Sequence, residues 1–153
     1  MVGVKLAKAI QKAKRVYICG NGGSAANALH IANDLVACGI KAHALPGEIA
    51  TVTASANDYS YDEAFSKSLE AYGEEGDLLI VLSGSGKSPN ILKAMAVAKE
   101  KRMKSFAIVG EFNKDCPAAV VADECLRWGK DMQEAEEKQL YLGHKVMRWL
   151  KAS

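Results

Sequence analysis

Short apolar runs that alternate with helical patterns constrain the fold of this 153-residue chain more than any other feature. The runs that predict strands lie at 15–20, 40–45, 77–83, 105–110 and 122–128. The segments that predict helices lie at 3–14, 24–38, 47–71, 88–101 and 130–151. The segment 47–71 holds one or two helices, with Asn57-Asp58 as a break between them. The run at 77–83 is almost wholly apolar, which is typical of a strand buried on both faces of a parallel sheet. We therefore expect an α/β fold, a doubly wound parallel five-stranded sheet with helices on both faces.

Length and composition indicate one ordinary globular domain over residues 1–153. Apolar residues make up 49% of the chain and charged residues 25%, which excludes disordered and fibrous classes. The net charge is only +2 with interspersed signs, so we expect no nucleic-acid partner. No stretch approaches the roughly 20 apolar residues that span a bilayer, and we expect no membrane partner. The four cysteines have no CxxC spacing, which favours a reduced, cytoplasmic protein.

The first unusual loop, GNGGSA at 20–25, joins a predicted strand to a predicted helix. Its glycines permit close backbone approach, and the N–H groups of the following helix are free to bind an anion. The loop also satisfies the G-x-G-x-x-A dinucleotide fingerprint. That fingerprint expects an acidic residue at the end of the second strand, but the first acid there is Glu48, beyond the strand. Nicotinamide binding is therefore disfavoured.

The second unusual loop, SGSGKSPN at 83–90, follows the most apolar predicted strand. Its Gly-Lys-Ser step resembles a P-loop, but that motif requires a glycine where Val81 stands inside the strand. What remains is a set of hydroxyls and amides at a helix N-terminus, which suits a phosphate monoester. Because both loops follow strands of one parallel sheet, we expect them at the same edge, where such sheets bind ligands.

Three segments together resemble the signatures of the sugar isomerase (SIS) domain family: 20–24, ANDY at 56–59, and 83–88. The resemblance extends from about residue 14 to 150, and within the family it is closest to the phosphoheptose isomerases. It implies a flavodoxin-like SIS fold. It also implies an aldose–ketose isomerase that converts sedoheptulose 7-phosphate to D-glycero-D-manno-heptose 7-phosphate through an enediol(ate), as in lipopolysaccharide heptose biosynthesis.

The resemblance also implies which residues hold the substrate. Ser83, Ser85 and Ser88 correspond to the phosphate-binding serines, with Gly84 where the family usually has threonine. The full set of implied phosphate and sugar contacts is Asn21, Gly22, Ser24, Asp58, Ser83, Gly84, Ser85, Ser88 and Glu136.

The family's catalytic pair corresponds to Asp34 and His144, with Asp34 replacing the usual glutamate. We expect no required cofactor. Some family members carry a metal, and a zinc ion would here correspond to His30, Asp34, Glu136 and His144. His30 and Asp34 are spaced i,i+4, so a helix brings them to one face. His43, inside a strand pattern, is interpreted as structural.

The sequence leaves other functions open: a non-catalytic SIS adaptor like the one that assists the bacterial replication initiator, and a dinucleotide-binding module. Other phosphosugar chemistries, such as those of regulators or aminosugar enzymes, are also open. The change from glutamate to Asp34 favours the adaptor, whereas the presence of both Asp34 and His144 favours the enzyme. Family resemblance predicts a homo-oligomer, either dimer or tetramer. We expect the apolar stripe of the last predicted helix to pack against a helix of another copy; it comprises Met132, Ala135, Leu142, Val146 and Trp149.

Overall fold

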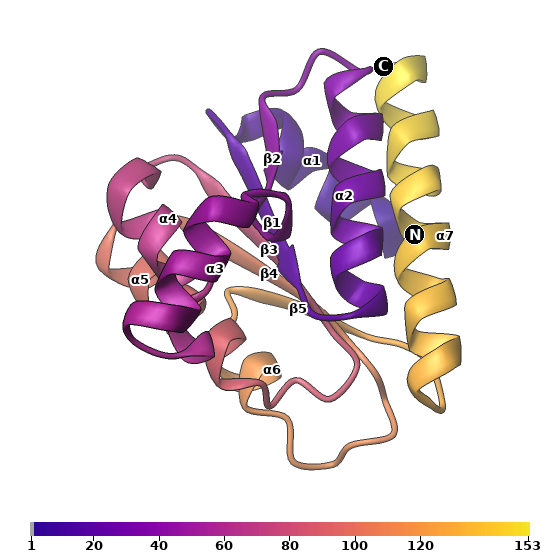
Figure 1. Cartoon of the computed structure of the whole chain (residues 1–153). Helices are drawn as coiled ribbons and strands as arrows, with labels where there is room; N and C mark the ends of the chain where they lie inside the picture. The colour runs from indigo at the N-terminus through magenta and orange to yellow at the C-terminus, as the bar shows by residue number, and fades with distance from the viewer. Residues whose placement is uncertain (1) are drawn as a thin grey trace.

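The computed structural model describes residues 2–153 as a five-stranded sheet between two layers of helices (Figure 1). The strands are β1 (Val16–Gly20), β2 (Ala42–Ala44), β3 (Leu78–Ser83), β4 (Lys104–Val109) and β5 (Glu124–Arg127). All neighbouring strands pair in parallel, in the order β2-β1-β3-β4-β5. This confirms the predicted doubly wound parallel sheet, with the flavodoxin-like strand order.

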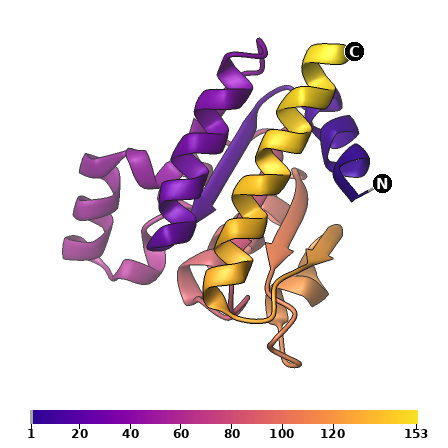
Figure 2. The same cartoon turned by 90° about the vertical axis from the view of Figure 1, so that its right-hand side faces the viewer.

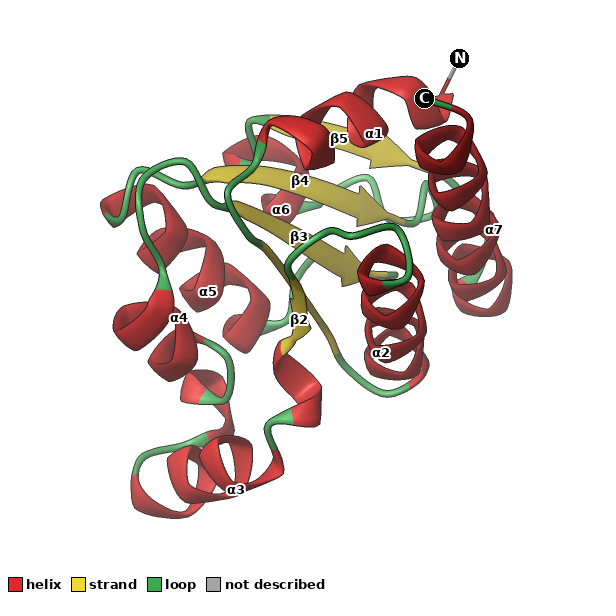
Figure 3. Ribbon diagram, turned by 90° about the horizontal axis from the view of Figure 1, so that it is seen from above, coloured by secondary structure: helices red, strands yellow, loops and turns green. Residues whose placement is uncertain are grey.

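The helices cover both faces of the sheet, as Figure 3 shows from above. The α-helices are α1 (Val2–Lys12), α2 (Gly23–Val36), α3 (Ile49–Asp58), α4 (Ser66–Tyr72), α5 (Pro89–Glu100), α6 (Pro117–Val121) and α7 (Met132–Ala152). Two short 3-10 helices, η1 (Leu45–Gly47) and η2 (Tyr61–Glu63), flank α3. Among residues 2–153, no helix has both the length and the apolar composition needed to cross a membrane.

Alternate residues of the central strands point into two separate apolar cores. In β1, Tyr17 and Cys19 face the core that includes α4, α5 and α6, whereas Val16 and Ile18 face the core that includes α1, α2 and α7. Burial raises the pKa of the Cys19 thiol, so it stays protonated and acts as a small apolar residue. Each strand face therefore stabilises a helical layer.

The predicted helical segment 47–71 is divided at the expected break, because α3 ends at Asp58 and α4 begins at Ser66. The sequence did not predict η2 between them, or that this turn presents Tyr61 toward the first glycine loop. The helix α6 was not predicted, because its five residues are too few to show a helical period.

The apolar stripe of α7 is used within the chain, which corrects the expectation that it would pack on a second copy. Ala135, Leu142 and Val146 are each 2% exposed, and α7 contacts both α1 and α2. Figure 2 shows α7, in yellow, crossing in front of the strands beside α2. The stripe is consequently no argument for an oligomer.

A polar bridge fixes α7 against α2. The Asn27 amide of α2 donates to the backbone carbonyl of Glu136 at 2.9 Å and to Oε1 of Gln139 at 3.1 Å. Gln139 is 1% exposed, and its Nε2 atom has no hydrogen-bond partner among residues 2–153. Because Asn27 hydrogen-bonds to two successive turns of α7, it sets the axial position of α7 relative to α2.

We expect Asn27→Leu to lower the free energy of unfolding by about 1–3 kcal/mol, because it leaves buried acceptors of α7 without their donor. Gln139→Met, which removes the unpaired amide together with its acceptor, should change it by less than about 1 kcal/mol. Urea unfolding of both variants measures the two effects. Equal losses would show that the bridge does not depend on Asn27.

Gly86, in the loop between β3 and α5, has a φ of +67° that L side chains rarely adopt. A Cβ at this position would overlap the sulfur of Cys116, which is itself 4% exposed. Gly39, in the loop after α2, has a similar φ of +78°, but nothing in the described chain lies within 4 Å of its Cβ position. The two glycines therefore separate backbone strain from steric overlap.

We expect Gly39→Ala to cost about 1 kcal/mol of stability from the left-handed backbone alone. Gly86→Ala should cost a further 1–3 kcal/mol, roughly, because Cys116 has little room to move. Thermal or urea unfolding of the two variants checks the difference. Equal losses would mean that the contact with Cys116 relaxes freely.

Candidate active site

A pocket of about 80 Å³ lies at the carboxyl ends of β1 and β3, where the strand order reverses. Gly20 of β1 pairs in register with Leu82 of β3, so the loops that follow the two strands are neighbours. The residues that line the pocket are Asn21, Ser24, Leu82, Ser83, Gly84, Ser85, Ser88, Met132 and Glu136. Both unusual loops and the start of α7 therefore contribute to one site.

The serine loop, residues 83–88, is folded around its own hydroxyls. Ser83 Oγ accepts from the Gly86 N–H at 2.9 Å, and Ser85 Oγ accepts from the Lys87 N–H at 3.2 Å. A hydroxyl that accepts a backbone hydrogen bond keeps its own proton free to donate to a ligand. Ser88 occupies the N-cap of α5, and within the described chain its side chain makes no capping hydrogen bond. The loop thus offers three hydroxyl donors at a helix N-terminus.

Lys87 does not bring its charge into this pocket. Its ammonium group lies 3.6 Å from Asp115 Oδ2, and both side chains are well exposed. The pocket's anion-binding capacity therefore depends on hydroxyls, amides and the N-terminus of α5.

Asn21, the first residue of the glycine loop after Gly20, is held by two other elements. Its amide forms a reciprocal pair with the Asn90 amide of α5, with both hydrogen bonds 2.9 Å long. The hydroxyl of Tyr61 in η2 also donates to Asn21 Oδ1, at 2.8 Å. Three elements that are distant in sequence meet at this one side chain.

Side chains of α7 close the other side of the pocket. A Cβ at Gly84 would overlap the sulfur of Met132, so the methionine fills the place where a side chain at position 84 would lie. A Cβ at Gly23 would overlap the Glu136 carboxylate in the same way. Glu136 therefore lies against the first residue of α2, where the helix dipole favours a negative charge.

His30 and Asp34 of α2 and His144 of α7 form a second cluster. His30 Nε2 lies 3.0 Å from His144 Nε2, and Asp34 Oδ2 lies 3.4 and 3.7 Å from these two nitrogens. The Asp34 side chain is 15% exposed, and its Oδ2 has no hydrogen-bond partner among residues 2–153. One ligand atom from each residue falls within 4.8 Å of the others, an arrangement that suits a metal ion.

The structure separates some residues that the sequence grouped together. Glu136 is not part of the His30–Asp34–His144 cluster and lines the phosphate-type pocket, so it does not complete the predicted set of four metal ligands. Asp58 is exposed at the end of α3, where its Oδ1 accepts from the Asn57 amide. Gly22 is the N-cap of α2 and does not line the pocket in the described chain.

The sequence interpretation of the site did not include Leu82 and Met132, which line the pocket, or Asn90 and Tyr61, which hold Asn21. Asn90 is 2% exposed and had a visible signal, since it follows Pro89 directly after the serine loop. No sequence signal pointed to Tyr61, because only the turn through η2 brings it near Asn21. The exposed ring of His43 in β2 stacks on Tyr17 with ring centroids 5.8 Å apart, consistent with a structural role.

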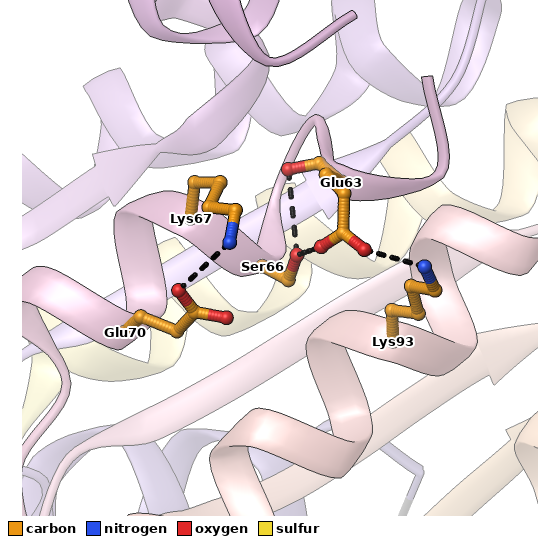
Figure 4. Close-up of polar contacts among 5 residues, drawn as sticks. All are labelled: Glu63, Ser66, Lys67, Glu70 and Lys93. Atoms are coloured by element: carbon orange, nitrogen blue, oxygen red, sulfur yellow. Dashed lines mark hydrogen bonds and ion pairs between the residues drawn. The ribbon is translucent and has the colours of Figure 1, made fainter. Parts of the chain in front are cut away.

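The segment η2 is fastened to the helices beneath it, as Figure 4 shows. Glu63 pairs with Lys93 of α5 and accepts a hydrogen bond from Ser66 of α4. The hydrogen bond from Lys93 is the largest of the contributions that lower the pKa of the Glu63 carboxyl. Together with the Tyr61 contact, these bonds attach η2 at both ends.

Comparisons with known proteins agree with this geometry. The SIS domain family model matches residues 2–110. The phosphoheptose isomerase of Chlorobaculum parvum is 42% identical over 113 residues, 69% of this chain and about half (54%) of that protein. The phosphoheptose isomerase of Thermodesulfovibrio yellowstonii is 37% identical over 145 residues, 91% of this chain and 72% of that protein.

A solved structure extends the likeness to three dimensions. The phosphoheptose isomerase from Neisseria gonorrhoeae superposes with a TM-score of 0.90 at 30% identity, covering 97% of this chain and 84% of that one. The likeness therefore includes β5 and α7, which lie beyond the part matched by the family model. The chain belongs to the SIS domain family and, within it, to the phosphoheptose isomerases.

Proposed function

We propose that this protein is a phosphosugar isomerase that interconverts sedoheptulose 7-phosphate and D-glycero-D-manno-heptose 7-phosphate. The observation that carries the proposal is the nearly buried Asp34 carboxylate beside the His30 and His144 imidazoles, on the helix that starts from the glycine loop. It supplies an acid and a base, while the serine loop supplies an anion site on the same sheet edge. The non-catalytic adaptor is not favoured, because the relatives are phosphoheptose isomerases.

The charges around the pocket orient the substrate. The sugar phosphate binds at the serine loop, where Ser83, Ser85 and Ser88 surround the N-terminus of α5. The N-terminus of α2 is already occupied by the Glu136 carboxylate, which repels a phosphate and accepts hydrogen bonds from sugar hydroxyls. The carbon chain therefore extends from the serine loop toward α2 and α7. We propose that Ser24 and Asn21 contact it on the way, and Asp58 from the end of α3.

Proton transfer between C1 and C2 needs one base and one acid. In the ketose-to-aldose direction, the Asp34 carboxylate takes a proton from C1 while the His144 imidazolium donates one to the carbonyl oxygen on C2, giving an enediol. Asp34 then returns its proton to C2 as His144 takes the proton of the C1 hydroxyl, which leaves an aldehyde at C1. Both side chains end the cycle in their starting forms.

The His30–Asp34–His144 cluster also fits a zinc ion, because two imidazole nitrogens and a carboxylate oxygen form a common three-residue zinc site. The buried Asp34 Oδ2 supports this assignment, because it has no hydrogen-bond partner among residues 2–153 and lies 3.4 and 3.7 Å from the two imidazole nitrogens. A bound zinc ion would supply Lewis-acid polarisation of the sugar carbonyl. Homo-oligomerisation and a cytoplasmic location remain predictions from the family and from the cysteine pattern.

We expect Ser85→Ala combined with Ser88→Ala to weaken sedoheptulose 7-phosphate binding by about 2 kcal/mol, roughly 30-fold in Kd, because each hydroxyl donates to a charged group. Isothermal calorimetry measures the loss. Ser105→Ala, at the opposite edge of the sheet, is the control and should bind normally. Unchanged affinity in the double variant would place the phosphate elsewhere.

Asp34→Asn and His144→Ala should each lower the isomerisation rate by at least about 100-fold, because each removes one proton-transfer group. Both variants should still bind the phosphosugar, since the serine loop is intact. Exchange of the C1 proton in deuterated water, followed by NMR, measures the chemistry directly. His43→Ala is the matched histidine control. Full activity in either site variant would contradict the proposed roles of Asp34 and His144. A parent protein that never exchanges the C1 proton would contradict the proposal that it is an isomerase.

A further inference from the structure

The Asn21 amide is almost fully committed within the protein. A carboxamide has two N–H donors and two acceptor lone pairs. Asn21 Oδ1 accepts from both Asn90 and Tyr61, and Asn21 Nδ2 donates once, to Asn90. Within residues 2–153, three of the four hydrogen-bonding positions are therefore used, and one N–H remains in a residue that lines the pocket.

The Asn21–Asn90 pair joins the two ligand-binding loops past the ends of their strands. Asn21 belongs to the loop after β1, and Asn90 is the second residue of α5, immediately after the serine loop. Asn90 is 2% exposed, so water does not compete for its amide. The pair consequently sets the position of the glycine loop relative to the phosphate-binding loop.

Tyr61 extends this link to η2. Tyr61 is 52% exposed, so its hydrogen bond to Asn21 is not a by-product of core packing. The other end of η2 is held by Glu63, which pairs with Lys93 one turn after Asn90 on α5 (Figure 4). Both ends of η2 are thus connected to α5, one through Asn21 and one through Lys93. These contacts hold Tyr61 in place, so its hydroxyl can orient the Asn21 amide.

We infer that Asn90 and Tyr61 are positioning residues of the isomerase: they fix the Asn21 amide so that its one free N–H faces the sugar, and they hold the phosphate at a set distance from the acid–base pair. The inference rests on the proposed function. Loss of alignment lowers the rate of the chemical step about 10- to 100-fold, because small displacements of a reacting group are costly. Phosphate binding itself depends on the serine loop and is not affected.

The test compares Asn90→Leu, Tyr61→Phe and the double variant with the parent and with Ser105→Ala, which removes a buried hydrogen bond far from the site. For each protein, kcat and KM are measured with sedoheptulose 7-phosphate, the Ki with inorganic phosphate as competitor, and Tm by calorimetry. Asn90→Leu should lose at least about tenfold in kcat with Ki within twofold of the parent. Tyr61→Phe should lose less, about threefold, and add nothing to Asn90→Leu, because it acts through Asn21.

An unchanged kcat in Asn90→Leu overturns the inference, as does a Ki that rises in proportion to the lost kcat, which would mean that Asn90 only supports the serine loop. If Asn90→Leu does not fold, the exposed Tyr61→Phe decides: a lower kcat at constant Ki supports the inference, and parental kcat overturns it. A parent that does not turn over overturns the proposed function and this inference with it. If the parent turns over substrate and every variant keeps full activity, only the inference is overturned, and the proposed function stands.

Discussion

The parallel pairing of β1 with β3 is the interaction on which the site depends. The two strands are not consecutive, and the chain leaves β1 toward one face of the sheet and enters β3 from the other. This reversal leaves an open crevice at the carboxyl ends of the pair. Register brings Gly20 beside Leu82, so a glycine loop and a serine loop meet there with two helix N-termini.

The two helix N-termini at this crevice differ in whether a protein carboxylate already occupies the position for an anion. At α2 the place for an anion is taken by the Glu136 carboxylate of α7, whereas at α5 the serine hydroxyls leave it open. In the proposed function, this difference favours a substrate that binds with its charged end at α5 and its hydroxylated end toward α2. Glu136 acts in this way because α7 returns across the sheet to lie beside α2.

The return of α7 also assembles the His30–Asp34–His144 cluster. His144 is more than a hundred residues from His30, yet their Nε2 atoms are 3.0 Å apart. The Asn27 amide sets the register of the two helices by binding successive turns of α7. One turn of slippage would move His144 by about 5.4 Å along α2, enough to break the contacts of its ring with His30 and Asp34.

The sequence by itself determined the sheet, the two loops and the helical pair His30 and Asp34, because these depend on local periods and on turn residues that adjacent positions specify. It did not determine that Glu136 lies apart from the His30–Asp34–His144 cluster, that α7 buries its stripe within the chain, or that Tyr61 and Asn90 hold Asn21. Those outcomes require the axial register and rotation of α7 on α2 and the path of η2 across α5. They are decided by packing between segments distant in the chain, which leaves no period in the sequence.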